Sequence, residues 1–190
     1  MPDSIPILSF RTPAAFRKWL AANHLTSGPI WLRIYKKDSG TSSITYPEAL
    51  DEALCYGWID GLKNPHDEVS WKQRFTRRRA KSGWSKINTQ HVERLIRDGR
   101  MKPAGQAEID AAKKDGRWEN AYNSQGTAIF PEDFLKALSQ DAKAQAFFDS
   151  LNKANRYAIA YRLQTAKRPE TKQKRLDDIL ARLSRGDKFH

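Results

Sequence analysis

The chain has 190 residues, of which 39% are hydrophobic and 11% aromatic, and its net charge is +12. This length suits one compact domain or one domain with a helical appendage, and the apolar content suffices for a core, which excludes wholesale disorder. The single cysteine excludes an internal disulfide and fits a reducing compartment.

The N-terminal third predicts a helix, a strand and a second helix. The first helix begins at Thr12 as N-cap with Pro13 at the first helical position. The segment 30–35, "IWLRIY", alternates apolar residues on one side with Trp31, Arg33 and Tyr35 on the other, which is typical of a strand. In the second helix Thr45 and Glu48 form a capping-box pattern, and Gly57 is placed to end it.

A β-hairpin is predicted next. Residues 58–63 and 68–76 alternate, and the Asn-Pro-His-Asp sequence at 64–67 is a turn signal between them. In the second strand one face carries Val69, Trp71, Gln73 and Phe75, and the other carries Ser70, Lys72, Arg74 and Thr76.

The rest of the chain predicts helices. The first begins near residues 84–85, with Ile87, His91, Leu95 and Ile96 inward, and others begin at Pro103 and Pro131. Segments 141–150, 153–166 and 170–184 follow, and the last has an apolar stripe of Leu176, Ile179, Leu180 and Leu183. We therefore expect an α+β fold, with a small antiparallel sheet packed with helices in a domain at 1–100 and an all-helical region at 101–190.

The N-terminus lacks the charged and apolar regions of a signal peptide. No apolar run approaches the roughly 20 residues that span a bilayer. We expect a cytoplasmic protein without membrane insertion.

Motifs of known chemistry are absent. There is no nucleophile elbow, phosphate loop, dinucleotide fingerprint or C-x-x-C pair, and the four histidines lack ligand spacing, so we expect no metal site and no cofactor. Cys55 in "CYGWIDG" is either a thiolate nucleophile or a half-buried residue at a helix end, and no base lies nearby in sequence. The sequence thus favours a non-enzymatic protein and names no catalytic residue.

Asp60 is a candidate for an unusual environment. On a strand beside Trp58 and Leu62 its carboxylate needs a countercharge, which Arg74 in the next strand can supply. Two interpretations are open: a structural ion pair, or a polar pocket in which Asp60 orients Arg74 towards an anion. Asp51, on the preceding helix, is a candidate second member.

The segment 71–86 is strongly basic. It contains seven cations and no acid, namely Lys72, Arg74, Arg77, Arg78, Arg79, Lys81 and Lys86. It is interpreted as a solvated loop, as a nucleic-acid interface in which Trp71, Phe75 and Trp84 stack bases, or as a small-anion site with Ser82 and Ser85 at a helix N-terminus. The candidate ligand-binding residues are Asp51, Trp58, Asp60, Arg74, Arg77, Arg78, Ser82, Trp84 and Ser85.

Several segments together resemble the bacterial YdeI/OmpD-associated protein family. They are "SITYPEALDEALCYGWIDG", "QRFTRRRAKSGWSKIN", "NRYAIAYRLQTAKRPETKQKRLDDILARLSRG" and the final "DKFH", so that the resemblance runs from about Phe16 to the C-terminus. The family's name implies associations with bacteriocin protection and an outer-membrane porin, and it implies no chemistry.

The sequence therefore predicts a bacterial stress- or resistance-associated protein that binds an anionic ligand at the hairpin and segment 71–86. The alternatives are a nucleic-acid-binding protein and an adaptor that acts through a protein partner. Neither the ligand nor the oligomeric state follows from the sequence.

Overall fold

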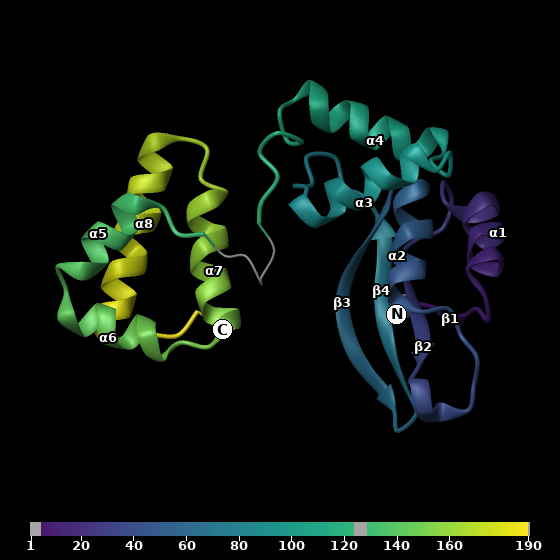
Figure 1. Ribbon diagram of the computed structural model, residues 1–190, viewed down its shortest axis with the longest axis horizontal. Coiled ribbons are helices and arrows are strands. Elements are labelled where there is room, and N and C mark those ends of the chain that lie inside the picture. Colours follow the sequence, from purple (N-terminus) through teal and green to yellow (C-terminus); the bar gives the residue numbers. More distant parts are fainter. Residues whose placement is uncertain (1–4, 124–128, 190) are drawn as a thin grey trace. The chain divides into compact units, whose positions relative to one another are not determined.

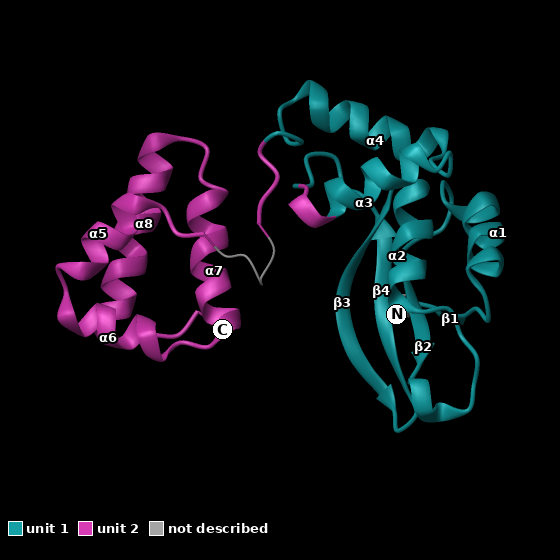
Figure 2. Cartoon of the chain, in the orientation of Figure 1, with its two compact units in different colours: residues 1–83, 88–119 teal, residues 84–87, 120–190 magenta. Residues whose placement is uncertain are grey.

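The computed structural model describes residues 5–123 and 129–189. These residues form two compact units (Figure 2). Unit 1 comprises Met1–Gly83 and Asn88–Glu119, and unit 2 comprises Trp84–Ile87 and Asn120–His190. Among the described helices, none is both long enough and apolar enough to cross a bilayer.

Unit 1 is built on a four-stranded sheet with strand order β1-β2-β4-β3 (Figure 1). The strands are β1 (Ile7–Ser9), β2 (Ile30–Tyr35), β3 (Trp58–Asp67) and β4 (Ser70–Arg77). β1 runs parallel to β2, whereas β2 and β3 are both antiparallel to β4. The α+β class is confirmed, and the short β1, which the sequence analysis did not find, makes the sheet mixed.

The hairpin turn lies later than predicted. Asn64-Pro65-His66-Asp67 is part of β3, and the chain turns at residues 68–69. β3 is an edge strand, so Pro65 removes no hydrogen bond from a central ladder and the strand tolerates it. Register shifts between Asp60 and Lys63 and between Pro65 and Asp67 show that the pairing is irregular there. Val69, predicted to share a strand face with Trp71, Gln73 and Phe75, is consequently in the turn and 44% exposed.

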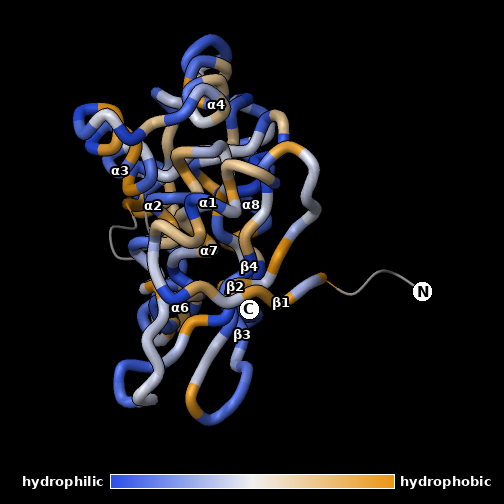
Figure 3. Tube along the Cα trace, turned by 90° about the vertical axis from the view of Figure 1, so that its right-hand side faces the viewer, coloured by the Kyte–Doolittle hydropathy of each residue, from blue (hydrophilic) through white to orange (hydrophobic). Residues whose placement is uncertain are grey.

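Two helices pack against one face of this sheet, α1 (Pro13–Asn23) and α2 (Tyr46–Cys55) (Figure 1). The Phe16 ring of α1 lies 5.9 Å from that of Phe75, and the Trp19 ring lies 5.8 Å from that of Trp58. The predicted caps are present, since Thr12 accepts from the Ala15 amide and Glu48 accepts from the Thr45 amide. Figure 3 colours the chain by hydropathy and shows hydrophobic and hydrophilic stretches in alternation. This alternation is expected of helices and strands that bury one side only.

The helix α3 (Lys86–Arg97) is rotated relative to the prediction. Its buried residues are Thr89, Val92 and Leu95, whereas Ile87 and Ile96 are 43% and 40% exposed. His91 and Arg94 both contact the carboxylate of Asp51 on α2, and these polar contacts determine which side of α3 faces inward.

The helix α4 (Pro103–Lys114) belongs to unit 1, which continues to Glu119, whereas the sequence suggested a boundary at residue 100. α4 lies against the end of α2. A Cβ built on Gly105 would lie 2.4 Å from the carbonyl oxygen of Cys55 and 2.7 Å from that of Leu54. Glycine is therefore required where the two backbones touch.

Unit 2 contains four helices among its described residues, α5 (Glu132–Ser139), α6 (Ala142–Ser150), α7 (Lys153–Gln164) and α8 (Pro169–Arg185). They share a core in which Phe134, Phe148 and Ile159 are buried. The stripe predicted on α8 is confirmed: Leu176, Ile179 and Leu183 are buried and Leu180 is partly buried.

We predict that Gly105→Ala lowers the free energy of unfolding by about 1–3 kcal/mol, because the added methyl overpacks a contact made of backbone atoms. Urea denaturation measures the change. Gly28→Ala is the matched control, since a Cβ there meets nothing within 4 Å and should leave stability nearly unchanged. Equal stabilities of the two variants would contradict the close approach of α4 to α2.

Candidate functional site

The carboxylate of Asp60 does not have the partner predicted from the sequence. It accepts a hydrogen bond of 2.8 Å from the Tyr46 hydroxyl and takes part in no ion pair among the described residues. Burial, followed by the charge of Asp60, raises the pKa of Tyr46 far above its ordinary value. The predicted Asp60–Arg74 pair is wrong because Asp60 lies opposite Phe75, and alternate residues of β4 point to opposite faces.

Trp58, Arg77 and Arg78 hold the fold together locally. Trp58 is fully buried, and its indole nitrogen donates to the His24 carbonyl oxygen at 3.1 Å. Arg77 donates to a loop carbonyl oxygen, that of Leu25, at 3.0 Å. Arg78 is 6% exposed and donates to the Gly83 carbonyl oxygen at 3.2 Å. Two of the seven cations of the basic segment thus donate to backbone carbonyl oxygens.

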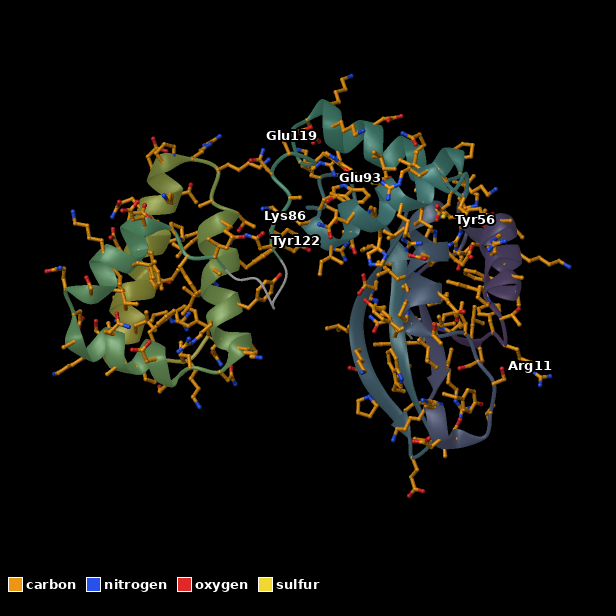
Figure 4. All side chains as sticks on the ribbon, viewed as in Figure 1. Arg11, Tyr56, Lys86, Glu93, Glu119 and Tyr122 are labelled. Atoms are coloured by element: carbon orange, nitrogen blue, oxygen red, sulfur yellow. The ribbon has the colours of Figure 1, made fainter. Side chains whose placement is uncertain are left out.

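The remaining candidates of the basic segment lie in its last residues. The Ser82 carbonyl oxygen accepts from Arg117 at 2.8 Å. Trp84 is 2% exposed, and Ser85 pairs with Tyr122 in an isolated bridge. The adjacent Lys86 amide donates to the Tyr122 carbonyl oxygen at 2.9 Å, and the two residues lie side by side in Figure 4.

Trp84 and Ser85 belong to unit 2, whereas the other candidates belong to unit 1. A single anion site formed by all nine candidate residues therefore stays a prediction.

Asp51 is part of a buried ion network that the sequence did not reveal. It lies beside Glu52 on α2, and the two side chains are 13% and 1% exposed. Arg94 donates to both oxygens of Asp51 at 2.7 and 2.8 Å. Arg17 binds Glu52 through two hydrogen bonds of 2.6 and 2.8 Å, and Arg100 donates to the same carboxylate at 2.8 Å. Three arginines from different segments thus neutralise two adjacent acids.

The network has a fourth basic member, His91, whose Nδ1 lies 3.1 Å from Asp51 Oδ1. The hydrogen bond to Asp51 raises the pKa of Arg94, and the hydrogen bond to Glu52 raises that of Arg17. Each carboxylate already accepts hydrogen bonds from guanidinium groups. Asp51 thereby links α2 to α3, and both of its oxygens have hydrogen-bond partners.

We predict that Glu52→Gln lowers the free energy of unfolding by about 2 kcal/mol, because two guanidinium groups lose their common countercharge. Glu93→Gln makes the same chemical change at an exposed position of α3 and should shift stability by less than about 0.5 kcal/mol. Thermal and urea unfolding of both variants give the comparison. A network without energetic weight would leave the two variants equally stable.

Cys55 is buried at the end of α2. Burial, with a contribution from Glu52, raises the pKa of its thiol from 9.0 to about 11. The group is therefore protonated at neutral pH, which argues against the thiolate interpretation of "CYGWIDG".

We predict that Cys55 in the folded protein reacts with a disulfide reagent at pH 8 at least about 100-fold more slowly than in urea, because two pKa units lower the thiolate fraction about 100-fold. Since the folded state favours the neutral thiol, the raised pKa of Cys55 stabilises the folded protein fully below pH 9, and this stabilisation is lost as the pH rises to about 11. Equal reaction rates in buffer and in urea would show that the thiol is accessible.

The opposite face of the sheet has a different character, and we call it the outer face. Its residues are Trp31, Arg33 and Tyr35 of β2 and Lys72 and Arg74 of β4. Ile30, Leu32 and Ile34 of β2 point to the helix-covered face and are buried, so strand alternation alone assigns the others to the outer face. All five outer-face side chains are half-buried.

Cations and rings alternate on the outer face. Lys72 Nζ lies 5.1 Å from the centre of the Trp31 ring, and the Arg33 guanidinium lies 4.4 Å from that of Tyr35. Arg33 is held in place by Ser70 at 2.9 Å and Asp67 at 2.6 Å. The outer face therefore presents two aromatic rings, each with a cation over it.

Arg74 is the unsatisfied member of the outer face. It lies directly opposite Trp31 in the β2–β4 register. Its Nε is buried without a hydrogen-bond partner, and the guanidinium forms no ion pair with any residue in 5–123 or 129–189. A half-buried cation without an acid favours an anion from outside the chain.

The outer face as a unit does not follow from the sequence alone. The alternation of β2 and β4 is visible in the sequence, whereas the pairing of β2 with β4 is not. The aromatic residues proposed for base stacking lie elsewhere: Phe75 and Trp84 are buried, and Trp71 is on the helix-covered face beside Tyr46.

Within the described residues no group of three or more His, Cys, Asp or Glu is arranged to hold a metal ion.

Two family models match the chain. The model described as "Domain of unknown function (DUF8412)" matches residues 8–108, and the model described as "Bacteriocin-protection, YdeI or OmpD-Associated" matches residues 127–186. The resemblance to the second family is confirmed for the C-terminal part only, and its extension to Phe16 is corrected by the separate match at 8–108. No curated protein and no solved structure matches the chain.

Proposed function

The chain belongs to the family described as "Domain of unknown function (DUF8412)", a description that names no activity, and we propose from the geometry that the protein binds single-stranded nucleic acid on the outer face. The observation that carries the proposal is the juxtaposition of Trp31 and Arg74 across β2 and β4, with the arginine unpaired among the described residues. Phosphates would bind the cations, and unpaired bases would stack on the rings.

The chemistry of the outer face favours single strands. Aromatic rings and guanidinium planes on an open sheet stack bases that a duplex keeps inside its own stack. Arg33 is suited to this role because Tyr35 supports one face of its guanidinium and Ser70 and Asp67 fix its orientation. The net charge of +12 adds long-range attraction for any polyanion.

The proposal takes up the nucleic-acid alternative of the sequence analysis and changes the residues that bind the ligand. Asp51, Trp58, Asp60 and Arg78 have structural partners in unit 1, so of the sequence candidates Arg74 supports binding most directly. We place the activity in the cytoplasm, where the lone buried thiol of Cys55 stays reduced.

We predict that Trp31→Ala weakens binding of a fluorescein-labelled single-stranded oligonucleotide by about 5- to 150-fold, since stacking contributes about 1–3 kcal/mol per base. Trp31→Phe should retain most of the affinity. Arg74→Ala should also weaken binding and reduce its dependence on salt, because one phosphate contact is lost. Fluorescence anisotropy with RNA and DNA strands at two salt concentrations measures these effects, and a duplex of the same sequence should bind more weakly.

The matched control is Lys18→Ala, which removes an exposed cation from α1 on the helix-covered side of the sheet. It should change affinity far less than Arg74→Ala. If Lys18→Ala and Arg74→Ala weaken binding equally, the attraction is diffuse and the outer face is not the site. If no strand binds to the wild-type protein, the proposal fails.

A further inference from the structure

A concave region lies at the far end of the hairpin, where β3 and β4 meet the end of β2. It is a pocket of about 420 Å³, within the range of small-molecule sites. Lys36, Lys63, Asn64, Pro65, Asp67 and Trp71 contribute to its lining. None of the five outer-face residues that define the proposed nucleic-acid site lines it.

Trp71 gives the pocket a flat aromatic surface. The Tyr46 ring packs 6.2 Å from the Trp71 ring, and the hydroxyl of Tyr46 is bound to Asp60. These contacts fix the indole from the side of α2. Lys63 lies over the indole, with its Nζ 4.2 Å from the ring centre.

The charge of the pocket is unbalanced. Its one acid, Asp67, already accepts hydrogen bonds from Arg33 at 2.6 Å and from Ser70 at 2.6 Å. The hydrogen bond from Ser70 lowers the pKa of Asp67, so the carboxylate stays ionised and keeps its two hydrogen-bond donors. Lys36 donates to a backbone oxygen, that of Glu68, at 2.8 Å. Neither Lys36 nor Lys63 forms an ion pair within the described part of the chain.

We propose that this pocket binds a small ligand with a planar conjugated ring and one anionic group, such as a mononucleotide. The ring would lie on Trp71, and the anionic group would lie between Lys36 and Lys63. Lys63 now covers the indole as a cation–π partner. An anion offers its ammonium group a stronger, charge-assisted hydrogen bond, so ligand binding would draw Lys63 from the ring and open the stacking surface.

Titration calorimetry with adenosine 5′-monophosphate tests the proposal, with adenosine and inorganic phosphate as the two halves of the ligand. Wild-type protein should bind the nucleotide at least about tenfold more tightly than either half, because the ring and the anion contribute together. Benzoate, a planar carboxylate, distinguishes the source of the anion: competition with the nucleotide shows that a carboxylate suffices, and its failure to compete assigns the site to phosphates.

Lys63→Gln should weaken nucleotide binding by about tenfold or more, and since Lys63 is exposed the variant should fold normally. Lys37→Gln is the matched control, because Lys37 is an exposed neighbour of Lys36 that does not line the pocket. Trp71→Phe should weaken binding less than Lys63→Gln does. Trp31→Ala should leave nucleotide binding unchanged, which separates this pocket from the outer face.

Three results would overturn the proposal: no binding of the nucleotide, equal binding to wild type and Lys63→Gln, or inorganic phosphate binding as tightly as the nucleotide. A loss of nucleotide binding in Trp31→Ala would instead assign the nucleotide to the outer face, and the separate pocket would then be rejected.

Discussion

The arrangement of unit 1 depends on the burial of two adjacent carboxylates, Asp51 and Glu52, on α2. An ionised carboxylate out of water is strongly unfavourable unless cations and donors replace the lost hydration. Arg17, Arg94 and Arg100 supply both, and they come from α1, from α3 and from the residue just past Gly99. The polar requirement of two side chains therefore brings three segments together around α2.

This clustering has a consequence for the sheet. Because α1 and α2 pack against its Phe75 side, the residues between the core positions of β2 and β4 are directed to the other face. The same alternation divides the basic segment. Lys72 and Arg74 belong to the outer face, whereas Arg77 and Arg78, at and beyond the end of β4, donate to backbone carbonyl oxygens. A run of cations that is continuous in sequence is therefore divided into a structural set and a set without acidic partners.

The sequence predicted those elements whose pattern is local. The alternation of "IWLRIY", the Thr45–Glu48 cap and the apolar stripe of α8 each lie within one element, and each is confirmed. The ion network could not be predicted in this way, because its partners are 35 to 48 residues apart in the chain. The prediction of a turn at 64–67 was wrong because the same Asn-Pro sequence is tolerated in an edge strand. No local signal in the sequence distinguishes an edge strand from a central one.

The error at Asp60 shows how strand register decides a candidate site. A buried carboxylate next to a basic strand suggests an ion pair, and the nearest cation in that strand is Arg74. Pairing places Asp60 opposite Phe75, so Asp60 and Arg74 lie on opposite faces, and Tyr46 provides the donor that Asp60 needs. Arg74 is thereby left without the acid that would have neutralised it. The register that satisfies Asp60 internally is the one that leaves a guanidinium beside Trp31 available to an anion from solution.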